Sequence, residues 1–296
     1  MTSKGVPTNA IHGFTNFLLK FLKQHQPTHL AVALDAGRET FRRQIFAGYK
    51  ANRRTPPVNL IPQLPYIRRI LDALNLPWFE HPGYEADDLI GTVCETMRRE
   101  DCALVVVASD KDLMQLVTDN VRLFDGAKDR WIGALEVIAK FGVEPCRVTE
   151  VLGLMGDAVD NIPGVKGVGE KTAMALMRRF GSLENLFENL GNLDASGLRG
   201  VNRLRKILLE GKDTALRSRA LATIKRDAPI EITLGQLKIS GADRGKLRKL
   251  FVELEFSNLV ELLDHGVELT HNLSATAPVP AVEDTVGFQL ALFPWK

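Results

Sequence analysis

The stretch Gly83-Tyr84-Glu85-Ala86-Asp87-Asp88-Leu89-Ile90 places three carboxylates within four residues, at the start of a segment, residues 85–99, that is expected to be helical. Further acidic groups follow other predicted elements: Asp35, then Asp110 with Asp112, then Asp157 with Asp160. Like charges brought together in a fold raise one another's pKa, so such a cluster calls for divalent cations. Mg²⁺ takes oxygen ligands, and two ions roughly 4 Å apart can clamp the attacking and leaving oxygens of a phosphodiester. The pattern therefore predicts a hydrolytic magnesium site.

Each acidic group alone has a plainer explanation. An acidic first helical turn complements the helix dipole, and Asp110 can serve as an N-cap. Asp157 and Asp160 can belong to a surface turn. Four such groups in one chain make the metal site the favoured interpretation.

The composition is that of an ordinary soluble protein that is large enough for two domains, with 296 residues of which 45% are apolar and 25% charged. No run of about eighteen apolar residues exists, and the first residues lack the apolar core of a signal peptide, so the cytoplasm is expected and a membrane is not. Cys94, Cys102 and Cys146 show no Cys-x-x-Cys spacing, which supports neither a disulfide framework nor a zinc site. The net charge of +2 averages acidic and basic stretches, so local charge is the better guide.

Helices and strands alternate in the first half of the chain. Apolar spacing predicts a helix over residues 9–23, and an apolar run predicts a strand over residues 28–34. The order then repeats as helix 61–74, strand 77–79, helix 85–99 and strand 103–108. Such alternation predicts a mostly parallel sheet in an α/β domain of residues 1–149. Because ligands gather beyond the carboxyl ends of parallel strands, Asp35 and Asp110 fall where a site is expected.

The second half of the chain has a different pattern. Residues 150–264 contain short helical stretches punctuated by glycine, which predicts a second, helical domain. From residue 265 onward Thr, Ser, Pro, Ala and Val dominate, so residues 265–296 are expected to form a flexible tail.

The sequence GVKGVGEKTA at residues 164–173 is a glycine-rich turn that opens a helix. Its exposed backbone N–H groups suit a phosphate. A Walker A loop needs lysine directly after the last glycine, but Glu170 intervenes, so nucleotide-loop interpretations fail. A hairpin that grips a nucleic-acid backbone, with Lys166 and Lys171 as point charges, fits better. A packing corner between two helices is the alternative.

A basic run with interleaved aromatic residues follows Asp35. Its members are Arg38, Arg42, Arg43, Lys50, Arg53 and Arg54, with Phe41, Phe46 and Tyr49. Bases can stack on the aromatic rings while the cations follow a nucleic-acid backbone. A solvated basic face is the usual explanation of such a run, but its position directly after Asp35 favours a role at the site.

Together these residues resemble the 5′ nuclease family, which includes the 5′-3′ exonuclease domain of bacterial DNA polymerase I and the flap endonucleases. The resemblance covers about residues 5 to 262. The motifs that carry it are Gly5 to Ala10, Ala33 to Ala36, Phe41-Arg42, Tyr49 to Arg53, Gly83 to Ile90, Ser109 to Asp112, and Gly156-Asp157 through Gly169. The resemblance implies a resolvase-like (PIN-like) α/β domain that holds two Mg²⁺ ions, for which Mn²⁺ can substitute. A helix-hairpin-helix domain would follow, gripping duplex DNA and often binding a monovalent cation such as K⁺.

The family's functional residues are carried over position by position. Asp35, Glu85, Asp87 and Asp88 would bind one metal ion, and Asp110, Asp112, Asp157 and Asp160 the other. Lys50 and Arg53 would belong to a basic arch of about residues 38–55 that steers the scissile phosphate, with Arg42 close by. The hairpin residues expected on DNA are Gly164, Lys166, Gly167, Gly169, Lys171 and Thr172.

One departure concerns the start of the sequence. The family opens with an apolar strand that ends in Asp-Gly, whose aspartate is a metal ligand, and this sequence begins after that position. A start codon upstream of Met1 is the favoured explanation, because the other carboxylates are intact. A shortened protein that is slow or inactive is the alternative.

The C-terminal stretch Gln289-Leu290-Ala291-Leu292-Phe293 resembles the short peptide by which bacterial replication proteins dock on the sliding clamp. Such peptides bind as extended tails that fill apolar pockets, and the expected contacts are Gln289, Leu290, Leu292 and Phe293. An apolar end that packs on its own domain is the alternative. Removal of residues 289–293 is expected to abolish clamp binding and to leave flap cleavage unchanged.

The sequence thus predicts a monomeric, Mg²⁺-dependent, structure-specific 5′-3′ exonuclease and 5′-flap endonuclease. Its substrates would be DNA 5′ ends and flaps, including RNA-primed ends, in bacterial replication and repair. Water activated by metal would attack the phosphodiester, so no Ser, Cys or His nucleophile is required. The rival is a catalytically inactive branched-DNA-binding protein tethered to the clamp, since the first strand is missing. A PIN-type ribonuclease is disfavoured, because the glycine hairpin and the basic arch suit longer, branched DNA.

Overall fold

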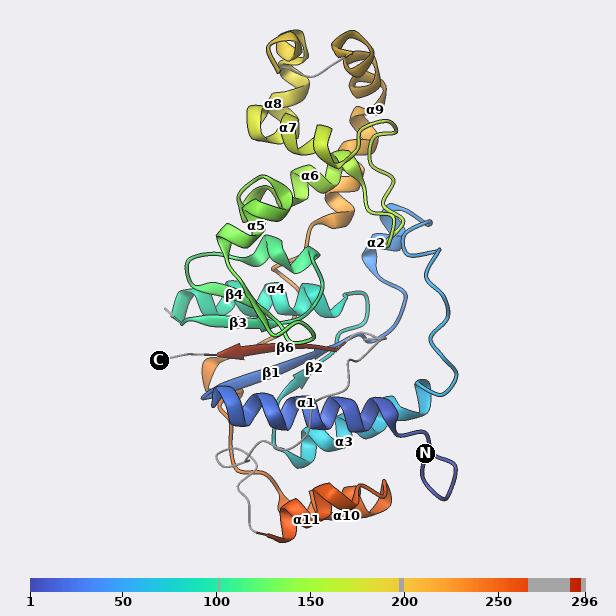
Figure 1. Cartoon of the computed structure of the whole chain (residues 1–296), viewed down its shortest axis with the longest axis vertical. Coiled ribbons are helices and arrows are strands. Elements are labelled where there is room, and N and C mark those ends of the chain that lie inside the picture. Colours follow the sequence, from blue (N-terminus) through green and yellow to red (C-terminus); the bar gives the residue numbers. More distant parts are fainter. Residues whose placement is uncertain (101, 197–199, 266–287, 294–296) are drawn as a thin grey trace.

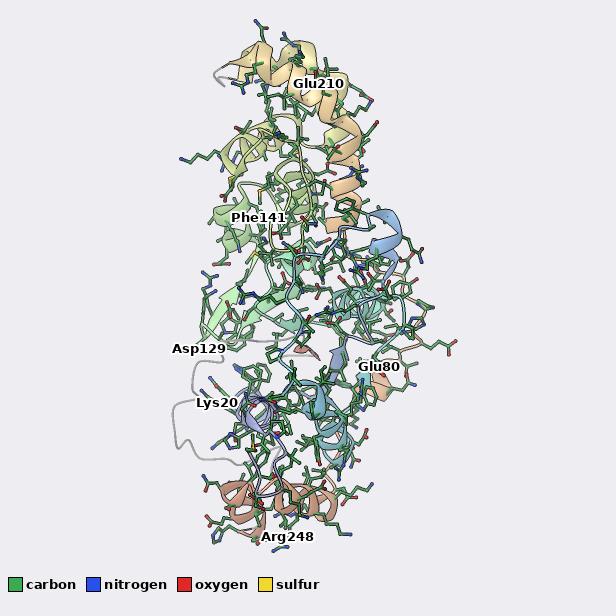
Figure 2. The ribbon with its side chains drawn as sticks, turned by 90° about the vertical axis from the view of Figure 1, so that its right-hand side faces the viewer. Lys20, Glu80, Asp129, Phe141, Glu210 and Arg248 are labelled. Carbon is green, nitrogen blue, oxygen red and sulfur yellow. The ribbon has the colours of Figure 1, made fainter. Side chains whose placement is uncertain are left out.

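The computed structural model describes residues 1–100, 102–196, 200–265 and 288–293. The molecule is elongated, with a sheet in the middle and helices from the second half of the chain at both ends (Figure 1). The labelled side chains of Glu210 and Arg248 mark these two ends in the view turned by a quarter (Figure 2). Among the described helices, none is both long and apolar enough to cross a membrane.

Among the described residues, six strands form one sheet in the order β2-β1-β6-β3-β4-β5. Their bounds are β1 His29–Leu34, β2 Trp78–Phe79, β3 Leu104–Val107, β4 Val121–Asp125, β5 Arg130–Ile132 and β6 Phe288–Phe293. β1 pairs with β2 and β3 pairs with β4 in parallel, while β5 turns back antiparallel on β4. The mostly parallel sheet is therefore confirmed, and the predicted strands at residues 28–34, 77–79 and 103–108 are correct to within a residue at each end.

Strand β6 lies in the middle of the sheet, although it follows every other described element in the chain. It runs antiparallel to both neighbours, so that Ala291 lies opposite Ala31 of β1 and also opposite Val106 of β3. The predicted flexible tail is therefore wrong for residues 288–293, because this apolar segment satisfies its backbone groups between two open strand edges. The remaining parts of that tail, residues 266–287 and 294–296, lie outside the described residues.

Alternate residues of β1 face two different cores. Ala31 and Ala33 pack on the side of α4 (Ala86–Met97), which η2 (Arg98–Glu100) continues. Val32 and its alternate neighbours face the opposite core. There the covering helices are α1 (Asn9–His25) and α3 (Leu64–Ala73), the latter preceded by η1 (Ile61–Gln63).

The periodicity of α1 explains how it covers the sheet. Ile11, Phe14, Leu18 and Leu22 are buried at three- and four-residue spacing, which places them along one face of the helix. This is the face predicted from residues 9–23, and the helix continues to His25 before Gln26 ends it in the left-handed conformation. Local apolar spacing was therefore sufficient to place this element.

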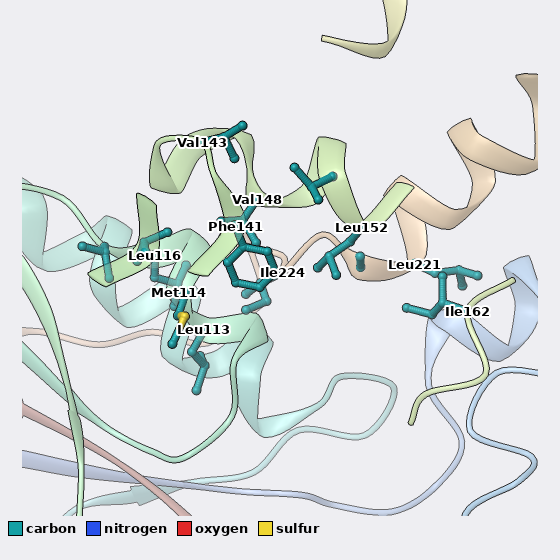
Figure 3. Close-up of a cluster of buried hydrophobic side chains, with 14 of the residues drawn as sticks. Leu113, Met114, Leu116, Phe141, Val143, Val148, Leu152, Ile162, Leu221 and Ile224 are labelled. Carbon is teal, nitrogen blue, oxygen red and sulfur yellow. The ribbon is translucent and has the colours of Figure 1, made fainter. Parts of the chain in front are cut away.

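A stack of helices extends the molecule away from the sheet (Figure 1). It consists of α5 (Ala134–Phe141), η4 (Pro145–Arg147), α6 (Val148–Met155), α7 (Glu170–Phe180), α8 (Leu183–Glu188), η5 (Leu190–Ser196) and α9 (Val201–Ala222). An apolar cluster joins the stack to η3 (Asp112–Leu116) of the sheet domain (Figure 3). The predicted helical domain after the sheet domain is confirmed, and the two parts share one core at their junction.

After α9 the chain returns to the sheet domain. The segment 223–243, which includes η6 (Leu234–Leu237), contributes Ile224 and Ala228 to the core beneath α4. The helices α10 (Arg244–Glu253) and α11 (Ser257–Asp264) then bury their apolar residues in the same core as α1 and α3. The end of the helical domain at residue 264 stays a prediction; in the described structure the apolar faces of α10 and α11 pack in a core of the sheet domain.

Candidate active site

Carboxylates gather at the edge of the sheet where β1 and β3 end. Asp35 directly follows β1, and its Oδ1 accepts a hydrogen bond of 2.8 Å from the backbone N–H of Ala86. Glu85 is the N-cap residue of α4, and its own N–H donates to Asp88 Oδ2 at 3.0 Å. The start of α4 is thus fixed against the end of β1, which brings Asp35 beside Glu85 and Asp87.

The second acidic pair lies on the connection that follows β3. Asp110 Oδ1 accepts a hydrogen bond of 2.9 Å from the backbone N–H of Asp112, the first residue of η3. This bond makes an Asx turn just before η3, whose N-cap residue is Lys111, so Asp110 is not the N-cap that the plainer alternative expected. The side chain of Asp112 is buried. The turn and metal binding are compatible, because a carboxylate has a second oxygen and further lone pairs.

Asp157 and Asp160 lie in a tight turn after α6. Asp157 and Ile162 exchange backbone hydrogen bonds of 2.9 and 2.8 Å, which close the turn. Both carboxylates are buried, so this is no solvated surface turn. The backbone N–H of Lys50 donates to Asp160 C=O at 2.9 Å, which fastens the basic segment after α2 (Phe41–Ile45) to the turn.

Cationic side chains lie among these carboxylates. Lys50 Nζ is 3.0 Å from Glu85 Oε2 and 3.5 Å from Asp160 Oδ2. Arg53 Nε donates to Asp160 Oδ1 at 3.1 Å. Lys111, to which sequence reasoning gave no role, has its Nζ 2.6 Å from Asp157 Oδ2. Its place between two aspartates was the signal that could have indicated this pairing.

The two-ion site predicted from the sequence is not preformed. Over the described part of the chain, no three Asp, Glu, His or Cys side chains converge as a ready cage for a metal ion. Three of the predicted ligands are instead neutralised by lysine, as Glu85 and Asp160 pair with Lys50 and Asp157 pairs with Lys111. The ammonium groups occupy the place of cations in an acidic cluster.

Two carboxylate oxygens nevertheless are buried without any hydrogen-bond partner, namely Asp87 Oδ1 and Asp112 Oδ1. Burial and the adjacent Asp110 carboxylate raise the pKa of Asp87. Burial, then Asp110 and Asp157, raises the pKa of Asp112 to about 7. A buried carboxylate without a donor is costly and is stabilised by a bound cation. This donor set of hard oxygen atoms fits Mg²⁺.

Arg42 lies beside the acidic cluster, with its Nη1 3.4 Å from Glu85 Oε2. It forms a buried ion pair in which Nη1 and Nη2 donate to the two carboxylate oxygens of Asp88 at 2.7 and 2.8 Å. The N–H groups of Glu85 and Lys225 donate to the same oxygens at 3.0 and 2.8 Å. These four donors occupy the lone pairs of the Asp88 carboxylate, which makes Asp88 a poorer metal ligand than its neighbours. The pair fastens α2 to α4 and to the segment after α9.

The prediction that Tyr49 stacks on a base is also wrong. Its side chain is 3% exposed, and its hydroxyl donates to Glu85 Oε2 at 3.0 Å. Burial, followed by the negative charge of Glu85, raises the pKa of this phenol, which keeps it a donor. Phe41 and Phe46 are half-buried, with Arg42 over the Phe41 ring and Arg217 over the Phe46 ring.

The glycine-rich turn connects α6 to α7, as a hairpin between two helices requires. Gly164, at φ +59°, packs so closely on Gly156 that a Cβ would lie 2.3 Å from the Gly156 nitrogen. Its own N–H donates to Ser218 Oγ at 3.0 Å. Gly164 is therefore buried within the turn, contrary to its predicted place on DNA. The other predicted residues are accessible: Lys166, Gly167, Gly169 and Lys171 are exposed and Thr172 is half-buried.

Comparison with known proteins supports the fold described above, a sheet domain followed by a helical part. Residues 1–142 match the family model described as the 5′-3′ exonuclease N-terminal resolvase-like domain, and residues 143–245 match the 5′-3′ exonuclease C-terminal SAM fold. Two solved structures share the fold. The 5′-exonuclease of phage T5 has a TM-score of 0.61 at 22% identity, over 74% of this chain and 82% of its own. The catalytic core of Rad2 has a TM-score of 0.54 at 16% identity, over 88% and 86%.

Relatives with higher sequence identity show the family to which the chain belongs. DNA polymerase I of Bacillus subtilis is 41% identical over 264 residues, which cover 88% of this chain but 29% of that protein. The chain thus spans less than a third of the length of the DNA polymerase I relatives. A 5′-3′ exonuclease of Aquifex aeolicus is 39% identical over 263 residues, which cover 89% of this chain and 88% of that protein. The chain therefore belongs to the 5′-3′ exonuclease family.

Proposed function

We propose that this chain is a Mg²⁺-dependent, structure-specific 5′ nuclease that removes 5′ ends and flaps from DNA in bacterial replication and repair, including RNA-primed ends. The observation that carries the proposal is the acidic cluster beyond β1 and β3, in which Asp87 and Asp112 each have a buried oxygen without a donor. The related Aquifex aeolicus protein, described as a 5′-3′ exonuclease over nearly the same length, supports the reaction class. The protein would act as a monomer in the cytoplasm, at the nucleoid.

Seven carboxylates would hold the two ions. Asp35, Glu85 and Asp87 would hold one ion, and Asp110, Asp112, Asp157 and Asp160 the other. Bound Mg²⁺ would supply an activated water and charge neutralisation at the leaving oxygen, and Mn²⁺ can substitute because it accepts the same ligands. Asp88 is left out of this set, since four donors already occupy it.

Lys50 and Arg53 would change partners during the reaction. In this structure Lys50 pairs with Glu85 and Arg53 pairs with Asp160. If these carboxylates held Mg²⁺, the two cationic side chains would be available to the scissile phosphate and would stabilise the negative charge that develops there. Tyr49 keeps its hydroxyl on Glu85 and thereby orients that carboxylate.

The helical part would grip the duplex next to the site. Lys166 and Lys171 are exposed on either side of the hairpin, where they can contact two phosphates of a backbone. The exposed glycines between them, Gly167 and Gly169, let a backbone approach closely. A K⁺ ion held at this hairpin is part of the same proposal.

The rival function is that of a catalytically inactive protein that binds branched DNA. The observation that favours it is β6, which fills the centre of the sheet next to β1 and β3 and runs antiparallel to both. Where β1 leads to Asp35, β6 places Phe288 opposite Leu34, so the neighbouring strand contributes no carboxylate there. Metal-dependent turnover separates the two functions.

The deciding experiment measures cleavage of a labelled 5′-flap DNA by the purified chain with and without Mg²⁺. The Asp110→Ala variant is expected to lose cleavage while it keeps DNA binding. Asp119→Ala, which removes an exposed carboxylate just beyond η3, is the matched control and should cleave at the normal rate. Binding without cleavage by the unaltered chain would favour the inactive DNA-binding protein.

Docking on the sliding clamp is a further part of the proposal. The place of β6 in the sheet changes the result expected when residues 289–293 are removed. Gln289, Leu290, Leu292 and Phe293 are the proposed contacts, and all four have backbone partners on β1. A peptide in the sheet cannot at the same time extend into a pocket of another protein. Removal of residues 289–293 is therefore expected to lower the stability of the sheet as well as clamp affinity, and unaltered clamp affinity would refute the docking role.

A further inference from the structure

The side chain of Gln115 joins the end of α9 to the turn at Asp110–Asp112, which carries two of the proposed metal ligands. Its Nε2 donates to the carbonyl oxygens of Ala222 and Asp112, both at 2.9 Å. Its Oε1 accepts a hydrogen bond from the N–H of Ile224 at 2.9 Å. The side chain is 5% exposed, so these three bonds to backbone are shielded from water. One amide thus spans two segments that are far apart in the sequence.

The side chains around this amide are apolar and buried. Leu113, Met114 and Leu116 of η3 pack in the same apolar cluster as Leu221 and Ile224 at the end of α9 (Figure 3). In such a low-dielectric setting each hydrogen bond is stronger, and an unmade one is costly. The amide therefore adds directional contacts to the apolar packing that joins the two backbone segments.

The bridge connects the DNA-gripping part to the acidic cluster. α9 ends at Ala222, and one turn earlier the Ser218 hydroxyl accepts the N–H of Gly164 in the hairpin. Gln115 thus continues a chain of contacts from the hairpin through α9 to Asp112, whose carboxylate has a buried oxygen without a donor. Within the described chain, the polar contacts of the Gln115 side chain are to backbone atoms, and its own backbone carbonyl oxygen accepts from Arg226 Nη2 at 3.1 Å.

We propose that Gln115 is a positioning residue that holds the Asp110–Asp112 turn in the geometry needed for Mg²⁺ and connects this turn to the C-terminal end of α9. The inference rests on the proposed metal-dependent function and deepens it. Residues that orient metal ligands from behind typically contribute a factor of about ten or more to metal affinity.

The test compares Gln115→Met with Thr92→Val. The first change removes three hydrogen bonds at nearly constant volume. The second removes two hydrogen bonds of Thr92 Oγ1, the one of 2.9 Å that it accepts from the Ala228 N–H and the one of 2.8 Å that it donates to the Asp88 carbonyl oxygen. The first of these holds the same returning segment to α4. Both variants should unfold at a lower temperature than the unaltered chain. Only Gln115→Met is expected to raise the Mg²⁺ concentration at half-saturation, by about ten-fold.

Two readouts are used on the full chain. One is the Mg²⁺ dependence of flap cleavage, and the other is the Mg²⁺-dependent rise in melting temperature without DNA. Identical Mg²⁺ curves for both variants would show that Gln115 acts on stability alone and would overturn the inference. If Gln115→Met does not fold, Gln115→Asn, which is too short to span both segments, is expected to give the same shift. An unaltered chain that is stabilised by Mg²⁺ but does not cleave would contradict the proposed function and leave the positioning role measurable.

Discussion

A single buried guanidinium shows what charge patterns reveal at the scale of residues. Arg42 belongs to a run of cations that the sequence places beside the acidic cluster, and that placement is correct. Which member of the run is buried depends on Asp88 and on the end of α9, neither of which is near it in the sequence. The acidic groups were therefore predictable from spacing, whereas the separate roles of Arg42 and Tyr49 required nonlocal packing.

Loss of Arg42 should be far more damaging than loss of its neighbour. Arg42→Met leaves Asp88 as an uncompensated buried charge, which is expected to lower the free energy of unfolding by about 3–5 kcal/mol. Arg43→Met removes a partly exposed cation whose partner, Glu39, is exposed, and should change it little. Urea unfolding of both variants measures the difference, and equal midpoints would contradict the buried pair.

The thiols are expected to differ sharply in reactivity. Burial raises the pKa of Cys94 to about 12, so that at pH 8 it stays protonated and shielded. Cys102 is also buried, while Cys146 is exposed. A disulfide reagent at pH 8 should modify one thiol rapidly in the native chain and three in urea. Cys146→Ser should abolish the rapid phase, and a rapid phase that persists in this variant would be at odds with the burial of the other two.

At the scale of elements, local patterns placed β1, β2 and β3 to within a residue and predicted α1, α3 and α4, but they gave no strand at β4, which pairs in parallel with β3, and no helix at α2 or α5. They could not place α10 and α11, because an amphipathic helix does not specify which distant surface covers its apolar face. They also could not distinguish a strand from a docking peptide at residues 288–293, since a short apolar segment suits both. The glycine hairpin was recognised, but the buried role of Gly164 depends on its contact with Gly156.

That contact gives a prediction for the hairpin. Gly164→Ala would place a Cβ against the backbone of Gly156 at a left-handed φ, which is expected to lower stability by more than about 1 kcal/mol. Gly191→Ala, in η5, meets nothing within 4 Å and has no left-handed φ, so it should be nearly neutral. Thermal unfolding of the two variants measures this difference. Equal melting temperatures would mean that the two backbones are not packed as described.

At the scale of the whole molecule, two returns of the chain hold the sheet domain together. Residues 223–264 come back from the helical stack to cover both cores, and β6 comes back to the centre of the sheet. The helical stack is therefore inserted between two parts of the sheet domain. Arg42 and Gln115 hold the point where the chain returns from it, at the end of α9.

Breaking β6 should loosen both of its neighbours. Ala291→Pro removes a backbone N–H from a strand that is paired on both sides, so a ladder bond is lost and the strand is disfavoured. Amide hydrogen exchange is expected to become faster in β1 and β3. The amides of α8, at the far end of the helical stack, serve as the internal control and should exchange as before. Unchanged protection of β1 and β3 would contradict the central place of β6.

The order of strands also bears on how the protein is made. The ribosome makes β1 and β3 long before residues 288–293, so the two strands lack their shared partner while the intervening residues are made. Contacts between such distant parts of a chain form slowly, and unpaired edges invite pairing with other chains in the meantime. The nascent chain should consequently be most exposed to wrong pairing before residues 288–293 emerge, and slower translation between β3 and β6 should prolong that exposure.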